Sequence, residues 1–175
     1  LSGTSVDSAL AAVTVSVVDA NTNNVVDGTS VTVSKVTGAG TLSGTLTTTT
    51  SGGVATFSDI RYNKTDAFTV KFTSINDSAN SNSITLTAGA AAKVLVETAA
   101  NGSGSVVATQ SITADQSVTG YSVTRDQFDN FVANVAATAW SLQSVNGGVV
   151  AGDLVAAGDS MSAVFSGNVI GTAVV

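Results

Sequence analysis

The chain of 175 residues contains no cysteine, no histidine and no proline, and only 10% of its residues are charged. Without cysteine it forms neither disulfides nor a thiol nucleophile, and without histidine it lacks the commonest general base and metal ligand. Six basic residues stand against twelve acidic ones, a net charge of −6, so we expect no nucleic-acid binding. No apolar run approaches the ~18 residues of a membrane span, so we expect no membrane insertion in this segment.

The residues that do abound are typical of strands. Valine, alanine, threonine, serine and glycine supply most of the chain, which suits thin β-sandwiches better than helices. In residues 13–17 valines alternate with Thr14 and Ser16, which places the valines on one face of a strand. Clusters of asparagine and glycine separate such segments and predict turns, so the sequence predicts an all-β sandwich. The other alternating segments are residues 31–33, 68–72, 84–86, 94–96, 121–123 and 174–175.

The two halves of the chain repeat one another. Asp19 matches Asp126 at an offset of 107 residues, and the match extends over residues 19–25 and 126–132. Two further blocks match at an offset of 108. A period of this length is the signature of tandem structural units. We therefore predict two domains, 1–88 and 89–175, with a boundary near residues 87–92. The two blocks at the longer offset pair residues 40–46 with 148–154 and residues 55–58 with 163–166.

Three motifs carry a family resemblance. Val-Thr-Val-Ser-Val-Val-Asp-Ala-Asn at residues 13–21, Gly-Thr-Leu-Ser-Gly at 40–44 and Gly-Gly-Val-Ala-Thr-Phe at 52–57 resemble bacterial Ig-like repeats of the invasin- and intimin-like adhesins and of large secreted surface proteins. The family usually has proline before the valine at the turn, whereas Asn24 precedes Val25 here. The resemblance implies two Ig-like β-sandwiches in series, an extracellular or cell-surface location, and a role as rigid spacers with occasional ligand-binding copies.

The ends of the chain do not match the repeat fully. The first domain has no counterpart of the strand expected at 92–98, and the second has no counterpart of the strand expected at 82–88. We therefore expect the first strand of domain 1 and the last strand of domain 2 to be missing, which would expose sheet edges. Leu1 also looks like an internal cut. Two explanations stay open: a window from a longer array, or a filament in which a neighbouring subunit supplies the strand.

Acidic and amide residues cluster at the two matching turns. Carboxylate and amide oxygens are ligands that calcium prefers. The first cluster, Asp19-x-Asn21-x-Asn23, has the spacing at which a calcium loop begins, and the second cluster lies at the matching place of the other copy. Asn24 stands where such a loop needs glycine, however, and Asp and Asn also occupy turns because their side chains bond nearby backbone amides. Both interpretations stay open, with calcium as the only cofactor considered. The candidate ligands are Asp126, Asp129 and Asn130, together with Asp19, Asn21 and Asn23.

Aromatic residues are few, at 5% of the chain. We expect Trp140 in a sandwich core, with an exposed sugar platform as the alternative. Phe57 and Phe165 occupy equivalent positions of the two copies and are expected to fill the two cores. A sugar-binding row would have to be made from Phe128, Phe131 and Tyr121.

No catalytic constellation stands out. Serine and threonine are numerous, but four lysines and no histidine offer no base to activate them, so we expect no enzyme and no catalytic residue. The prediction is a structural or adhesive repeat segment acting as a rigid stalk. The alternatives are a subunit of a self-assembling filament or surface layer, and a carbohydrate-binding module of a secreted enzyme. Expected partners are neighbouring Ig-like repeats or identical subunits, and a host-surface or glycan receptor.

Overall fold

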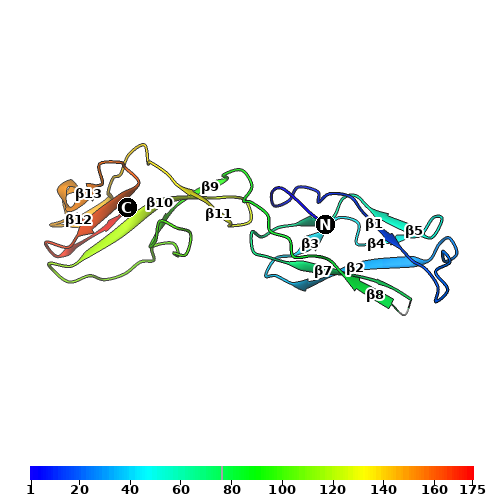
Figure 1. Cartoon of the computed structure of the whole chain (residues 1–175). Helices are drawn as coiled ribbons and strands as arrows, with labels where there is room; N and C mark the ends of the chain where they lie inside the picture. Colours follow the sequence, from blue (N-terminus) through cyan, green and yellow to red (C-terminus); the bar gives the residue numbers. More distant parts are fainter. Residues whose placement is uncertain (76) are drawn as a thin grey trace. The chain divides into compact units, whose positions relative to one another are not determined.

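The computed structural model describes residues 1–75 and 77–175, which form two compact units (Figure 1). Unit 1 is Leu1–Gly89 and unit 2 is Ala90–Val175. Across the described residues the regular elements are strands and one short 3-10 helix, so the predicted all-β class is confirmed. None of the helices in the described part of the chain has the length and apolar character needed to cross a bilayer.

Unit 1 places a four-stranded sheet against a two-stranded one. The larger sheet has the order β4-β2-β7-β8, and the smaller pairs β1 with β5. A third pair, β3 with β6, joins Leu42 to Tyr62. All pairings between these named strands are antiparallel. The strands are β1 (Val13–Ser16), β2 (Ser30–Thr37), β3 (Leu42–Ser43), β4 (Thr47–Thr49), β5 (Val54–Phe57), β6 (Arg61–Tyr62), β7 (Thr69–Ser74) and β8 (Asp77–Asn80).

The core of unit 1 follows from the alternation read in the sequence. Val31 and Val33 on β2 are 0% and 2% exposed, whereas the residues between and beside them face solvent. On β7 Val70 and Phe72 are buried, and the Phe72 ring lies 5.4 Å from the ring of Phe57 on β5. Two sheets that each present one apolar face therefore close on one another, as expected for a sandwich.

A buried tyrosine closes one end of this core. Tyr62 is fully buried and stacks on Phe68 with ring centroids 3.8 Å apart. Its hydroxyl donates to Asp66 Oδ1 at 2.8 Å and accepts the Gly40 N–H at 2.7 Å. Burial raises the pKa of the Tyr62 hydroxyl. Because both hydrogen-bonding roles of the hydroxyl are used, the ring is held without an unsatisfied polar atom.

The segment before β1 contributes to unit 1 without forming a regular strand. Ser5 makes an isolated parallel bridge to Thr87, and Val6 and Leu10 are 5% and 3% exposed. Similarly, the alternating residues 84–86 make an isolated bridge from Ile84 to Phe68 rather than a strand.

Unit 2 has one large sheet and one small one. In the five-stranded sheet β11, β10, β14 and β13 lie in that order, and β9 also pairs with β10. The second sheet contains only β12 and β15. The elements are β9 (Lys93–Glu97), β10 (Ser117–Arg125), β11 (Phe131–Asn134), β12 (Gln143–Gly147), the 3-10 helix η1 (Ala151–Asp153), β13 (Leu154–Ala156), β14 (Ser162–Ser166) and β15 (Gly171–Val174).

The repeat appears as equivalent strand pairs. In unit 1 β1 pairs with β5, and in unit 2 β10 pairs with β14. The matched alanines Ala55 and Ala163 therefore lie on corresponding strands, β5 and β14, and both are buried. Their neighbours differ, however. Phe57 is 1% exposed, as expected for a core residue, whereas Phe165 is only half-buried. The apolar core of unit 2 is therefore less completely covered than that of unit 1.

Candidate functional site

The two candidate calcium clusters form the same turn. In unit 1 the Asp19 backbone N–H donates to Asn23 O at 2.9 Å, and Thr22 N–H donates to Asp19 O at 3.0 Å. Asp19 Oδ1 accepts the backbone N–H groups of Asn21 and Asn23 at 2.8 and 2.9 Å. The amide of Asn23 also donates to Asp19 Oδ2 at 3.1 Å. These hydrogen bonds hold the pKa of Asp19 below its ordinary value, with the Asn23 side chain as the main cause.

Unit 2 reproduces these bonds one by one. Asp126 N–H donates to Asn130 O at 3.0 Å, and Asp129 N–H donates to Asp126 O at 3.2 Å. Asp126 Oδ1 accepts the N–H groups of Phe128 and Asn130, and its Oδ2 accepts the Asn130 amide at 2.9 Å. The fourth residue of each turn is left-handed, with φ of 66° at Thr22 and 64° at Asp129. Sequence matching at an offset of 107 residues thus corresponds to an identical hydrogen-bonded loop.

The geometry supports the turn interpretation of these residues. In both loops the carboxylate oxygens that calcium would need already accept N–H donors. Asp129 points elsewhere, since its carboxylate contacts Lys93 Nζ at 2.5 Å in an exposed ion pair. Among residues 1–75 and 77–175 no three acidic, histidine or cysteine side chains gather at metal-binding distance. Calcium binding at Asp126, Asp129 and Asn130 stays a prediction.

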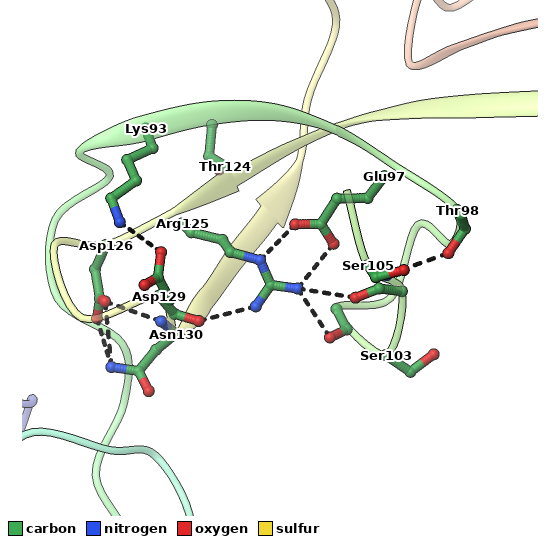
Figure 2. Close-up of polar contacts among 12 residues, drawn as sticks. Lys93, Glu97, Thr98, Ser103, Ser105, Thr124, Arg125, Asp126, Asp129 and Asn130 are labelled. Carbon is green, nitrogen blue, oxygen red and sulfur yellow. Dashed lines mark hydrogen bonds and ion pairs between the residues drawn. The ribbon is translucent and has the colours of Figure 1, made fainter. Parts of the chain in front are cut away.

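A buried ion pair lies directly beside the unit 2 turn (Figure 2). Arg125 is the last residue of β10, and Glu97 is the last residue of β9; the two strands pair side by side. Arg125 Nε donates to Glu97 Oε1 at 2.5 Å and Arg125 Nη2 donates to Oε2 at 2.8 Å, so the contact is bidentate. The Glu97 side chain is 1% exposed and that of Arg125 is 14% exposed. The bond to Glu97 raises the pKa of Arg125.

The guanidinium also joins two loops to this strand pair. Nη1 donates to Asp129 O at 2.9 Å, and Nη2 donates to Gly102 O at 3.1 Å. Gly102 has φ of 81°, and a Cβ there would overlap the ring of Phe131, so only glycine lets the loop lie this close. One side chain therefore holds β9, β10, the loop at 98–105 and the turn at 126–130 together (Figure 2).

The aromatic candidates do not form an exposed row. Trp140 is half-buried, and its Nε1–H donates to Ser160 O at 2.9 Å. Phe131 lies against Gly102 within its own unit. Tyr121, Phe128 and Phe131 are all half-buried. A sugar platform needs ring faces open to solvent, and the geometry of these residues gives no support to that alternative.

No protein-family model matches the chain, and no curated protein matches it. Two solved structures are similar to it. The "D0-D1 domain of Intimin" matches with a TM-score of 0.40 and 16% identity, over 96% of this chain and 81% of that one. The "surface layer protein SbsC, domains 1-6" matches with a TM-score of 0.38 and 12% identity, over 100% of this chain and 24% of that one.

Sequence reasoning missed the pair of Glu97 and Arg125. The two residues are 28 positions apart, and no spacing rule connects positions on two strands joined by a loop of unknown length. A signal was nevertheless present. Glu97 is the only glutamate of the chain, and it ends the apolar run Val94-Leu-Val96. A lone charge that follows strand-forming valines is a candidate for a buried, paired group.

Proposed function

We propose that the chain is a load-bearing structural segment of an extracellular or cell-surface protein, with no catalytic role. It would act as a stalk built from Ig-like units, whose neighbours are further units of the same kind. The observation that carries the proposal is the pairing of the first and last segments of unit 1. This pairing is parallel, so it joins the points at which a pulling force would enter and leave the unit.

The parallel contact consists of several bonds in one place. Val6 N–H donates to Thr87 O at 3.0 Å, and Thr87 N–H donates to Thr4 O at 3.0 Å. The Thr87 hydroxyl also donates to Thr4 O, at 2.8 Å. Beside them, Asn82 Nδ2 donates to Leu1 O at 3.0 Å. When the two ends of the unit are pulled apart, parallel segments slide along each other, and these bonds are loaded together instead of one after another.

The core supports the same role. Val6 lies within the contact and is 5% exposed, so sliding the segment would also pull an apolar side chain out of the sandwich. Leu86, which precedes Thr87, is 3% exposed. Exposing a buried side chain of this size costs about 1.5–3 kcal/mol. Hydrogen bonds and burial therefore resist the same displacement.

Single-molecule force spectroscopy on the whole chain tests the proposal. Two unfolding events are expected, each releasing roughly 300 Å of chain, since unit 1 holds 89 residues at about 3.5 Å each. Val6→Pro removes the N–H donor to Thr87 and is expected to lower the rupture force of one event only. Thr87→Val is the matched variant with the smaller expected effect on the rupture force, because it removes only the hydrogen bond from the Thr87 hydroxyl to Thr4 O. If Val6→Pro leaves both rupture forces unchanged, the parallel contact bears no load.

A filament or surface-layer subunit completed by strand exchange is the second candidate. The second sheet of unit 2 consists of β12 and β15, and the edges of so small a sheet are places where a further strand could pair, which favours this candidate. The two candidates are compatible, because a load-bearing unit can also be joined to its neighbour by a shared strand.

A further inference from the structure

The chain contains two Asn-Gly pairs, Asn101-Gly102 and Asn146-Gly147. In such a pair the backbone nitrogen of the glycine can attack the side-chain carbonyl carbon of the asparagine, because glycine has no Cβ to obstruct the approach. The reaction closes a succinimide ring and releases ammonia. Both pairs lie in unit 2 and both asparagines are exposed, so neither the dipeptide nor access to water distinguishes them. The contacts of the two pairs do distinguish them.

Asn146 and Gly147 are the last two residues of β12, where this strand pairs with β15. The Gly147 N–H donates to Asn146 Oδ1 at 2.6 Å, so the nitrogen that must attack already contacts the amide that it attacks. The N–H of the next residue, Gly148, donates to Ile170 O at 3.1 Å. Alternate N–H groups of an antiparallel strand point to the partner, so that of Gly147 is directed away from β15.

The strand pair keeps Gly147 in this position. Its φ is 72°, a left-handed value, and a Cβ there would lie 2.5 Å from Ile170 O and 2.7 Å from Gly171 Cα. Only glycine therefore fits at this point of the pair. The contact between the Gly147 nitrogen and the Asn146 amide is thus fixed by the surrounding backbone, which is the condition under which proximity accelerates an intramolecular reaction.

The pair Asn101-Gly102 is held in a different way. Asn101 Oδ1 accepts the Ser103 N–H at 3.1 Å and the Ser103 hydroxyl at 2.6 Å, so its amide is turned past the glycine toward the following residue. Gly102 is itself fixed, because its carbonyl accepts Arg125 Nη2 at 3.1 Å and it lies against the ring of Phe131. These contacts have to break before the Gly102 nitrogen reaches the Asn101 amide.

We propose that Asn146 is a site of spontaneous deamidation in the folded protein and that Asn101 is protected from it. The Gly147 nitrogen loses its proton and bonds to Asn146 Cγ. The bond from Cγ to Nδ2 breaks, and Nδ2 leaves as ammonia with that proton. Water then opens the ring at one of its two carbonyl carbons. Opening at Cγ gives aspartate, and opening at the main-chain carbon gives isoaspartate.

Isoaspartate changes unit 2 in a way that aspartate does not. The main chain then continues through the former Asn146 side chain and is longer by one methylene group. The β12 residues on the two sides of this point therefore cannot both keep their register with β15. Because these two strands make up the second sheet of unit 2, the modification weakens that unit. This goes beyond a load-bearing role, since it assigns a site of covalent change.

The test incubates the whole chain at mildly alkaline pH, folded and, in parallel, unfolded in guanidinium chloride. Mass spectrometry after proteolysis follows both Asn-Gly pairs, because replacing the amide by a carboxyl group raises the peptide mass, and electron-transfer fragmentation separates isoaspartate from aspartate. In the folded chain we expect Asn146 to react at least about tenfold faster than Asn101. In the unfolded chain these contacts are lost, and we expect the two rates to agree within about twofold.

Two variants are matched controls. Ser103→Ala removes the hydroxyl bond to Asn101 and is expected to raise the Asn101 rate severalfold while the Asn146 rate stays unchanged. Asn146→Asp carries the new charge on an unaltered main chain. We expect the fluorescence of Trp140, the only tryptophan, to give this variant the unfolding midpoint of the unmodified chain. The isoaspartate fraction, isolated by chromatography, should unfold several degrees lower.

Three results would overturn the proposal. The first is an equal rate for Asn146 and Asn101 in the folded chain. The second is a folded chain in which Asn146 stays intact over the time in which the unfolded chain reacts. The third is an isoaspartate fraction as stable as Asn146→Asp, which would show that the pairing of β12 with β15 tolerates the longer main chain.

Discussion

Removal of the Glu97 carboxylate is expected to destabilise unit 2 selectively. Glu97→Leu removes the carboxylate that accepts both hydrogen bonds of the bidentate contact. The Arg125 guanidinium, 14% exposed, is then left without this anionic partner. Breaking a buried ion pair by removing one partner costs about 3–5 kcal/mol. Arg125 keeps carbonyl acceptors at Gly102 and Asp129, which offset part of the loss. We therefore expect a decrease of about 3 kcal/mol in the free energy of unfolding of unit 2.

Replacing both Glu97 and Arg125 should lower the free energy of unfolding of unit 2 much less than replacing Glu97 alone. In the double variant Glu97→Leu with Arg125→Met neither charge of the pair is left, and such exchanges are often neutral or stabilising. The coupling energy from the double-mutant cycle is expected to be about 2–3 kcal/mol. Lys93→Met, which breaks the exposed pair with Asp129, is the matched control and is expected to cost less than about 1 kcal/mol.

Urea unfolding followed by Trp140 fluorescence measures these quantities in unit 2. In a unit of this size, 3 kcal/mol corresponds to a decrease of roughly 12 °C or more in Tm, so a thermal scan gives an independent value. The effect of Glu97→Leu should change little with added salt, because the pair is buried. A loss below 1 kcal/mol for Glu97→Leu, or a coupling energy near zero, would refute the reasoning that the pair holds the unit together.

Thr22→Gly is expected to stabilise unit 1 by about 0.5–1 kcal/mol in calorimetry, because a β-branched residue is strained at φ of 66°; a loss would contradict this. Phe57→Ala should cost about 3–5 kcal/mol and Phe165→Ala clearly less, because Phe165 is only half-buried; equal costs would show that both cores are closed. Hydrogen bonds lower the pKa of Asp19 and of Asp153, for Asp153 mainly through the Val150 N–H. Both ionised carboxylates therefore stabilise the fold at pH values above their ordinary pKa of 3.8. The thermal unfolding midpoints of the two units should be constant from pH 7 to about 5 and decrease below about pH 4. A decrease already at pH 6 would point to other titrating groups. Millimolar calcium should leave both midpoints unchanged, and a rise of several degrees would show that calcium displaces the N–H donors of the turns.

The predictable part of the molecule is local. Val31 and Val33 were assigned to one buried face from alternation alone, because a strand directs every second side chain to the same side. The matched turns at Asp19 and Asp126 were found because their bonding partners lie within four residues in the sequence. Whether those oxygens bind calcium or amides was left open, since both uses require the same residue types.

The contacts between residues far apart in the sequence could not be predicted. Glu97 and Arg125 meet only because β9 and β10 pair in one register, and a shift of one residue would direct one of the two side chains to the other face. The expectation that Phe165 fills a core failed in a similar way. Phe57 packs against the ring of Phe72 on another strand, 5.4 Å away, whereas Phe165 is only half-buried, and contacts of this kind between strands cannot be read from the residues next to it in the sequence.

The amino-acid sequence by itself determined the all-β class, the repeat, the strand faces and the paired turns, because each of these depends on residues within one strand or one loop. Only the tertiary structure decided that Arg125 joins four segments and that the first and last segments of unit 1 run parallel. These depend on which strands lie side by side, and burial and pairing between distant segments are set by the packing of the whole unit and not by the local pattern.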